Sequence, residues 1–122
     1  MREERGQIAG DVVVYEPFTL WGSIGGNVTV IEGGKLYVRG AIYGNMQVER
    51  GGRVHILGIV SGDLIVHEGA KVIVSGQVGK NAINRGGRLH IDPTAIIHGT
   101  VKTRNGKTDD RRGEPPARRP GE

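Results

Sequence analysis

A repeat of about 18 residues runs through most of this 122-residue chain and constrains its fold more than any other feature. Segments of the type Gly-x-Ile/Val-x-Gly-Asn/Asp begin at residues 6, 22, 40 and 58, and degraded copies begin at 76 and 94. The first interval is slightly shorter than the others, which are all equal. Such a period predicts a solenoid, because one repeat can bury its apolar side chains only against its neighbours.

Short apolar–x–apolar segments inside each repeat predict strands. Val28-Thr29-Val30 and Val54-His55-Ile56 show the two-residue period of a strand with one buried face, and glycine-rich turn signals separate such segments. An aliphatic residue at every sixth position marks the inside of a three-sided coil: Ile24, Val30, Leu36, Ile42, Val48, Val54, Val60, Val66, Val72 and Val78. We therefore expect an all-β fold, a single-stranded parallel β-helix (solenoid) of five to six triangular coils with about 18 residues per coil.

The handedness of the coil is decided by the residues that follow this aliphatic ladder. The six-residue period itself resembles the left-handed hexapeptide repeat of acyltransferases and gamma-class carbonic anhydrases. That repeat usually has Gly, Asn, Asp or Ala directly after the aliphatic residue, whereas Tyr37, His55 and Ile73 stand in such places here. The mismatch favours a right-handed coil over a left-handed one.

Glycine makes up 22 of the 122 residues, a content that by itself would suggest collagen or disorder. Nineteen of these glycines lie between residues 6 and 99, mostly at the expected corners of the coils. We expect a charged N-terminal arm over 1–5, the β-helix over 6–103 and a disordered Pro/Arg-rich tail over 104–122. One residue is missing from the fifth coil near residues 80–82, which moves the expected inward position to Ile83.

No residue pattern in the chain indicates catalysis, a cofactor or a metal site. His55 and His90 share one outward row, but Ile73 separates them, and the chain has no cysteine. The strand-associated hydroxyl residues have no His/Asp pattern beside them in the sequence: Ser23, Thr29, Ser61 and Ser75. We therefore expect no enzyme, no cofactor and no metal.

Stacked coils align equivalent surface residues into rows. One row lies in the turns and consists of Asn27, Asn45, Asp63 and Asn81. Its side chains are expected to form hydrogen bonds with backbone amides of the turns. The row Glu32, Arg50, Glu68, Arg85 alternates in sign and is expected to support the strand register. In contrast, the row Lys35, Arg53, Lys71, Arg88 has one sign, which predicts a basic stripe that contacts an anionic partner.

The ends of the expected solenoid have no helix or polar cap that would cover them. Unpaired strand edges are templates for further pairing, and an end-to-end contact that does not close gives a filament. The expected polymer contacts are Ile8, Val12 and Val14 at the N-terminal end and Ile96 and Val101 at the C-terminal end.

The repeat resembles that of the bactofilins, the polymer-forming cytoskeletal proteins of bacteria. The best-matching segments are 58–66 and 68–76, and the resemblance covers residues 6 to about 103. It implies a right-handed triangular β-helix, nucleotide-free and non-polar polymerisation through terminal coils, frequent membrane association and a scaffold role for envelope enzymes. The N-terminal arm lacks the short apolar stretch that many members carry, which argues against membrane association.

These patterns predict a cytoskeletal scaffold protein that polymerises with itself and serves envelope-associated client proteins. We expect a cytoplasmic location, with the inner face of the membrane as the alternative. The net charge of +4 is spread along the chain without interleaved aromatic residues, which argues against a nucleic-acid partner. Two alternatives stay open: a non-polymerising module that binds an anionic envelope component, polysaccharide or protein through the basic stripe, and a left-handed hexapeptide-type trimeric enzyme.

Overall fold

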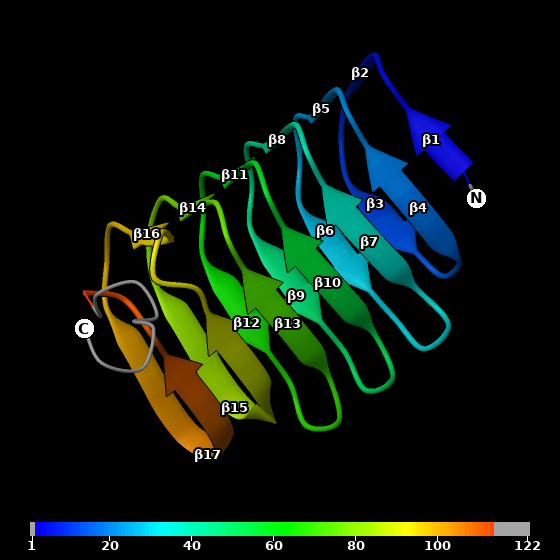
Figure 1. The fold of residues 1–122 in the computed structure, drawn as a ribbon. Coiled ribbons are helices and arrows are strands. Elements are labelled where there is room, and N and C mark those ends of the chain that lie inside the picture. Colours follow the sequence, from blue (N-terminus) through cyan, green and yellow to red (C-terminus); the bar gives the residue numbers. More distant parts are fainter. Residues whose placement is uncertain (1, 114–122) are drawn as a thin grey trace, which may run out of the picture.

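Three ladders of parallel strands run along one axis, and each coil of the chain adds a strand to each ladder (Figure 1). The computed structural model describes residues 2–113, which are all-β and form about six turns. Paired residues in successive coils lie 16 positions apart at first (Val12 with Val28) and 18 apart through the middle (Val28 with Met46). The predicted parallel β-solenoid with about 18 residues per coil is therefore confirmed.

Each ladder forms one side of the solenoid and is named here for its usual strand length. The four-residue face consists of β1 (Arg2–Glu4), β4 (Pro17–Leu20), β7 (Lys35–Val38), β10 (Arg53–Ile56), β13 (Lys71–Val74) and the second halves of β15 (Ala82–Ile91) and β17 (Val101–Asp110). The two-residue face consists of β2 (Gln7–Ile8), β5 (Ser23–Ile24), β8 (Ala41–Ile42), β11 (Ile59–Val60), β14 (Gln77–Val78) and β16 (Ile96–Ile97). The three-residue face consists of β3 (Val12–Val14), β6 (Val28–Val30), β9 (Met46–Val48), β12 (Leu64–Val66) and the first halves of β15 and β17.

The core is a column of aliphatic side chains enclosed by the three faces. Every member of the predicted six-residue ladder is at most 5% exposed, which confirms that ladder as the inside of the coil. Alternate residues of the longer strands complete each layer; Val38 and Ile56, for example, are fully buried. Parallel stacking places similar side chains above one another, so each coil covers the apolar surface that the preceding coil leaves open.

One corner brings the backbones of successive coils so close that only glycine fits from Gly22 to Gly76, whereas Ala95 takes the equivalent place in the last described coil. A Cβ atom added to Gly40 or Gly58 would lie 1.8 or 2.0 Å from the carbonyl oxygen of the equivalent glycine one coil earlier. Gly22 and Gly76 stand in the same column and meet the same restriction. This close approach explains why glycine recurs at the start of each repeat.

The fifth coil differs from the prediction in where its missing residue lies. Ala82 and Asn84 point inward and are fully buried, whereas Ile83, the expected inward residue, is partly exposed. Ala82 follows its partner Leu64 by the same number of residues as in the preceding coils. The residue that the fifth coil lacks is therefore missing later, at the corner around residues 85–87. Ile83 therefore keeps the outward orientation of Ile65, its partner in β12.

The solenoid also extends beyond both boundaries expected from the sequence. Arg2–Glu4, assigned to the charged arm, pairs with β4, and β17 continues to Asp110 within the segment expected to be a disordered tail. Parallel pairing uses backbone groups, so the open edge of an existing strand can hold a polar segment that has no apolar alternation of its own. Residues 114–122, the rest of the expected tail, lie outside the described residues.

Candidate functional surfaces

The N-terminal end of the solenoid has unpaired strand edges over apolar side chains. Within residues 2–113, β1, β2 and β3 each pair on one side only. Val14 is buried and Ile8 and Val12 are partly buried against the core, and together with Phe18 they line a hollow at this end. The structure thus brings together the three N-terminal residues predicted for a polymer contact.

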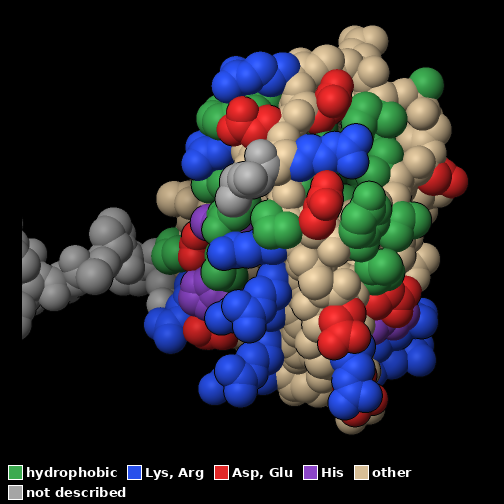
Figure 2. All heavy atoms as spheres, turned by 90° about the vertical axis from the view of Figure 1, so that its right-hand side faces the viewer, with side chains coloured by type: hydrophobic (Ala, Val, Ile, Leu, Met, Phe, Trp, Pro, Cys, Tyr) green, Lys and Arg blue, Asp and Glu red, His purple; other side chains and the backbone are tan. Residues whose placement is uncertain are grey.

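Charged groups surround this apolar end. Figure 2 views the molecule from the side where Figure 1 places the N-terminus, and hydrophobic, basic and acidic side chains are mixed on that face. The Arg2 guanidinium lies 5.6 Å from the centre of the Phe18 ring and pairs with Glu16 at 3.7 Å. Val13 and Tyr15, next to the open edge of β3, are more than half exposed.

The C-terminal end is more polar than the sequence suggested. Ile96 is paired with the outward Gln77 and is 47% exposed, so the inward residue of β16 is Ile97 instead. Val101, the other expected contact residue, is partly buried above Ala82. The side chain predicted for the contact at β16 therefore faces sideways from the solenoid, because the coil before it is one residue longer than usual.

Polar side chains fill the remaining inward positions of the last coil. Thr103, Thr108 and Asp110 stand above Asn84, Leu89 and Ile91, respectively. The hydroxyls of Thr103 and Thr108 are 2.6 Å apart, and Asp110 accepts a hydrogen bond from the Arg112 guanidinium at 2.8 Å. This hydrogen bond is the main reason that the pKa of Asp110 lies below its ordinary value. The last coil is therefore polar at most inward positions, whereas the N-terminal coil is apolar on its two- and three-residue faces and charged at Arg2 and Glu4, which stand over Phe18 and Leu20.

The basic stripe lies on the four-residue face as predicted and is longer than predicted. Lys35, Arg53, Lys71 and Arg88 occupy paired positions in consecutive strands, and Lys107 of β17 continues the row. All five side chains are exposed, and none forms an ion pair within the described chain. At a strand spacing of about 4.8 Å, the five positions span roughly 19 Å. We call this row of five residues the basic stripe.

Lys107 was missed because residues 104–122 read as a tail. The signal that could have found it is its separation from Arg88 along the chain. That separation exceeds the usual repeat by one position, as does the separation of Ile96 from Gln77. As long as the strand that pairs with β17 is unknown, nothing in this charged, glycine-containing segment shows that Lys107 belongs to the row of cations.

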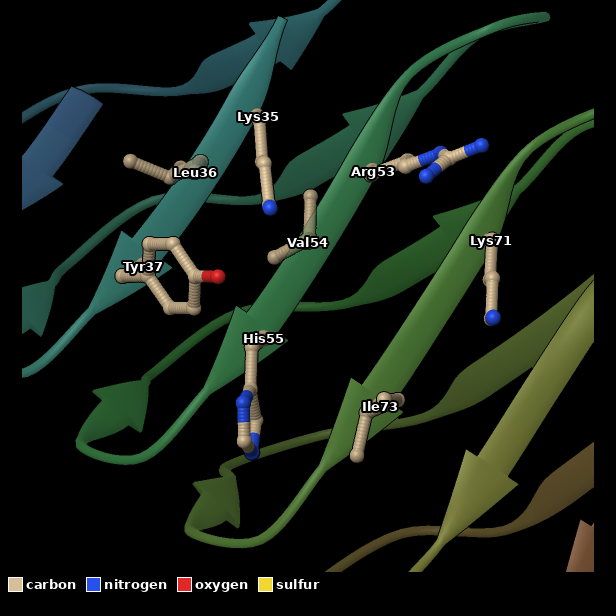
Figure 3. A pocket seen from close by; sticks show the side chains of 8 residues that line it. All are labelled: Lys35, Leu36, Tyr37, Arg53, Val54, His55, Lys71 and Ile73. Carbon is tan, nitrogen blue, oxygen red and sulfur yellow. The ribbon is translucent and has the colours of Figure 1, made fainter. Parts of the chain in front are cut away.

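A second row of side chains follows the basic stripe along the same strands. Tyr37, His55, Ile73 and His90 are paired in consecutive strands and are partly exposed. Figure 3 shows Lys35, Arg53 and Lys71 beside Tyr37, His55 and Ile73 in a shallow hollow of this face. The Lys35 ammonium lies 5.5 Å from the centre of the Tyr37 ring, and the Tyr37 and His55 ring centres are 6.1 Å apart.

The other side of the basic stripe is a glycine-rich corner, where the side chains of Glu32, Arg50 and Glu68 lie over Gly51, Gly69 and Gly86. A second shallow hollow runs there, formed by Arg53, Lys71 and Arg88 together with the small residues Gly51, Gly52, Gly69, Ala70, Gly86 and Gly87. Figure 2 shows Lys and Arg side chains gathered in a column beside histidines. The basic stripe thus has a shallow hollow on each side.

A hydrogen-bond network joins His55, Ser75, Asp92, His90 and Asp109 across four successive coils. His55 Nε2 lies 2.9 Å from Ser75 Oγ, and the Ser75 hydroxyl donates to Asp92 Oδ2. His90 contacts Asp92 through Nε2 at 2.9 Å and Asp109 through Nδ1 at 3.2 Å. Asp92 and His55 stand 17 and 20 positions from Ser75 in the sequence, so no local pattern indicated that the fold brings them beside it.

The order of this network does not match an activated nucleophile. In a Ser-His-Asp triad the histidine stands between the other two and takes the serine proton. Here the Ser75 hydroxyl donates its hydrogen bond to Asp92, so Ser75 Oγ accepts the hydrogen bond from His55 Nε2. The network connects neighbouring coils, and its last carboxylate, Asp109, has a pKa lowered chiefly by a hydrogen bond from Arg111.

The two other predicted rows have different outcomes. The turn-amide prediction is confirmed: the side-chain oxygens of Asn27, Asn45 and Asp63 each accept the backbone N–H one coil later at 2.8–2.9 Å. The row Glu32, Arg50, Glu68, Arg85 forms no ion pair between its members within residues 2–113. Instead, the Glu32 and Arg50 side chains cover Gly51 and Gly69, respectively, one coil later.

Within residues 2–113, no group of three or more His, Cys, Asp or Glu side chains is arranged to hold a metal ion. The described part of the chain contains no helix long and apolar enough to cross a membrane. In comparisons with protein-family models, with curated proteins and with solved structures, nothing matched this chain.

Proposed function

We propose that this chain is a self-assembling scaffold protein that associates end to end through its terminal coils without a nucleotide. The observation that supports this proposal most is the open N-terminal end, where unpaired strand edges lie directly over Ile8, Val12 and Val14. A second solenoid end placed there would pair with free backbone groups and remove apolar surface from water. The resemblance of the repeat to bactofilins points to the same role.

The chemical difference between the ends makes the N-terminal coil the stronger contact. Its inward positions on the two- and three-residue faces are apolar, whereas the last coil presents Thr103, Thr108 and Asp110. At the C-terminal end, Val101 and Ile97 supply the apolar part of a contact, and Ile96 is available only from the side. Association through two N-terminal ends would bury more apolar surface than a contact of unlike ends.

Self-association is tested with the full chain by sedimentation velocity and electron microscopy at micromolar concentration. Ile8→Arg places a charge at the apolar end and is expected to shift the chain toward monomers. Ile59→Arg is the matched control, since Ile59 is an outward residue in the middle of the same face and is 42% exposed. A chain that is monomeric at every concentration, or that loses association equally in both variants, would contradict the proposal.

The second candidate function is a binding module that acts through the basic stripe without polymerising. The row of like charges without acidic partners favours it, because such a row is repulsive unless solvent or an anion screens it. A monomer with salt-sensitive binding to an anionic partner would support this candidate. The basic stripe and the N-terminal end are different surfaces, so variants of one surface test one candidate without changing the surface on which the other depends.

The proposed scaffold has no catalytic residue and no cofactor. Its partners are copies of itself and envelope-associated client proteins, and its proposed location is the cytoplasm, with the inner face of the membrane as the alternative. The bactofilin resemblance supports these points.

A further inference from the structure

We infer that the basic stripe binds an extended acidic polysaccharide that carries a carboxylate on each sugar unit. The inference is independent of end-to-end assembly, because the stripe lies along the side of the solenoid. The reasons are the pitch of the cations, the shape of the surface beside them and the kinds of side chain that flank them.

The pitch is fixed by the backbone ladder. Each coil contributes one exposed cation, and neighbouring coils are about 4.8 Å apart. One pyranose ring in an extended glycan has a similar length, so a chain of such rings lying along the axis would place one sugar over each coil. The carboxylates of such a chain then recur along the row within reach of the long side chains of Lys35, Arg53, Lys71, Arg88 and Lys107.

The side chains of the stripe suit carboxylates. Arg53 and Arg88 can each bind a carboxylate with two parallel N–H donors, and the lysines supply point charges between them. A single bound carboxylate would gain little at such an exposed surface, but five aligned contacts act together. The straight row therefore favours a linear polymer over a small anion.

The flanking surfaces suit sugar rings. The apolar face of a ring can pack on Tyr37 and Ile73, and the Tyr37 hydroxyl can bond to a sugar hydroxyl. On the other side of the stripe, the Glu32 and Arg50 side chains cover Gly51 and Gly69, so the rings pack on the Tyr37 side and not on the glycine corner. Neither hollow is enclosed, as binding to the middle of a long chain requires.

Single-stranded nucleic acid fits this surface less well. Its bases would need stacking partners on successive coils, and Tyr37 is the only Tyr, Phe or Trp in the second row. The histidines of that row are already occupied, His55 with Ser75 and His90 with Asp92 and Asp109. A nucleic acid is therefore an outcome of the test that would overturn the inference.

The test uses the full chain and polygalacturonate, a linear polymer with a carboxylate on each sugar. Binding is measured by isothermal titration at low salt, with methyl-esterified polygalacturonate as the uncharged counterpart and oligo(dT) as the nucleic-acid probe. The variant K35Q/R53Q/K71Q/R88Q/K107Q removes the stripe. The matched control is R5Q/R39Q/K80Q/K102Q/R104Q, which removes five exposed cations from positions outside the stripe and its flanking hollows.

We expect polygalacturonate to bind and its esterified form not to bind, with a loss of affinity of about tenfold or more in the stripe variant and about twofold or less in the control. Circular dichroism of both variants checks that the exposed substitutions leave the fold intact. Equal losses in the two variants, equal binding of the esterified polymer, or tighter binding of oligo(dT) would each overturn the inference. Self-association of the same variants, followed by sedimentation, separates this result from that of the proposed scaffold function.

Discussion

Asn84 and Gly87 exchange two hydrogen bonds inside the solenoid: Asn84 Nδ2 donates to the Gly87 carbonyl at 3.1 Å, and the Gly87 N–H donates to Asn84 Oδ1 at 2.9 Å. The same amide also receives the Gly86 N–H and donates to the Lys107 carbonyl and to Thr108. The corner at residues 85–87 is one residue shorter than the corner at 67–70. The buried side chain thus supplies the polar groups that the missing residue would have contributed.

Replacement of this amide is expected to be costly. Asn84→Ala leaves buried backbone N–H and C=O groups without partners, which predicts a loss of about 2–4 kcal/mol in the free energy of unfolding. Urea unfolding followed by circular dichroism measures the loss. Asn105→Ala is the control, because Asn105 is exposed and has no side-chain hydrogen bond in the described structure, and it should unfold like the unmodified chain. Equal stability of the two variants would show that the Asn84 network contributes nothing.

The glycine column at the coil corner predicts a steric effect. In Gly58→Ala the new Cβ would lie 2.0 Å from the Gly40 carbonyl oxygen, so two coils must separate locally. The expected cost is about 1–3 kcal/mol, measured as a shift of the urea midpoint. In the control Gly25→Ala, the nearest atom would be 3.6 Å away, an ordinary contact, and no shift from crowding is expected. A midpoint of Gly58→Ala equal to that of the control would refute this explanation of the column.

The turn ladder predicts a difference between two substitutions of one residue. Asn45 Oδ1 accepts the Asp63 N–H at 2.8 Å, and Asp63 performs the same role for Asn81 at 2.9 Å. Asn45→Ala should therefore lose about 1 kcal/mol in the free energy of unfolding, whereas Asn45→Asp, which keeps the acceptor, should lose less. Thermal unfolding of both variants measures the difference. Equal losses would mean that the side-chain oxygen is not what the turn requires.

The last coil predicts a loss of stability in acid. The Arg111 and Arg112 hydrogen bonds, the largest causes, hold the pKa values of Asp109 and Asp110 below their ordinary value of 3.8. A lowered folded pKa means that these ion pairs stabilise the folded chain fully above that value and are lost as the pH falls through the folded pKa. Urea midpoints measured from about pH 6 to about pH 2 should fall less in Asp109→Asn/Asp110→Asn than in the unmodified chain.

The control for this pH series is Glu32→Gln, which removes a carboxylate without an ion pair in the described chain. It should keep the full acid dependence of the last coil. A double aspartate variant whose midpoints fall as steeply as those of the control would contradict the assignment.

Local patterns were sufficient for the body of the solenoid. The two-residue alternation around Val30 and Val48 gives each strand its buried face, and the constant repeat length stacks these faces in the same order in every coil. A repeat whose neighbours are its own copies needs no information from distant parts of the chain. The prediction of the inward ladder and of the turn amides depends on this property, and both were confirmed.

Where the coil length changes, the repeat was not enough to predict which side chains point inward. From the sequence, Ile83 was expected to point inward and Ile96 to lie in the C-terminal polymer contact. In the structure both side chains point outward, which could not be predicted because the spacing of the repeats does not show where within a coil a single residue is missing or added. A shift of one residue turns every later side chain to the opposite face of its strand. Hydrogen bonding of the corner decided the first case in favour of Asn84, and pairing with Gln77 decided the second.

By itself, the sequence determined the all-β fold, the parallel stacking and the rows of equivalent residues, since these follow from a period that the chain repeats. The tertiary structure decided which polar segments join the solenoid, and thereby added Lys107 to the basic stripe and Asp109 to the network around His90. It also made the two ends different, apolar at Ile8 and polar at Asp110. The reason is that the first and last strands are held by the backbone edges of their neighbours, and backbone pairing leaves no signature in side-chain alternation.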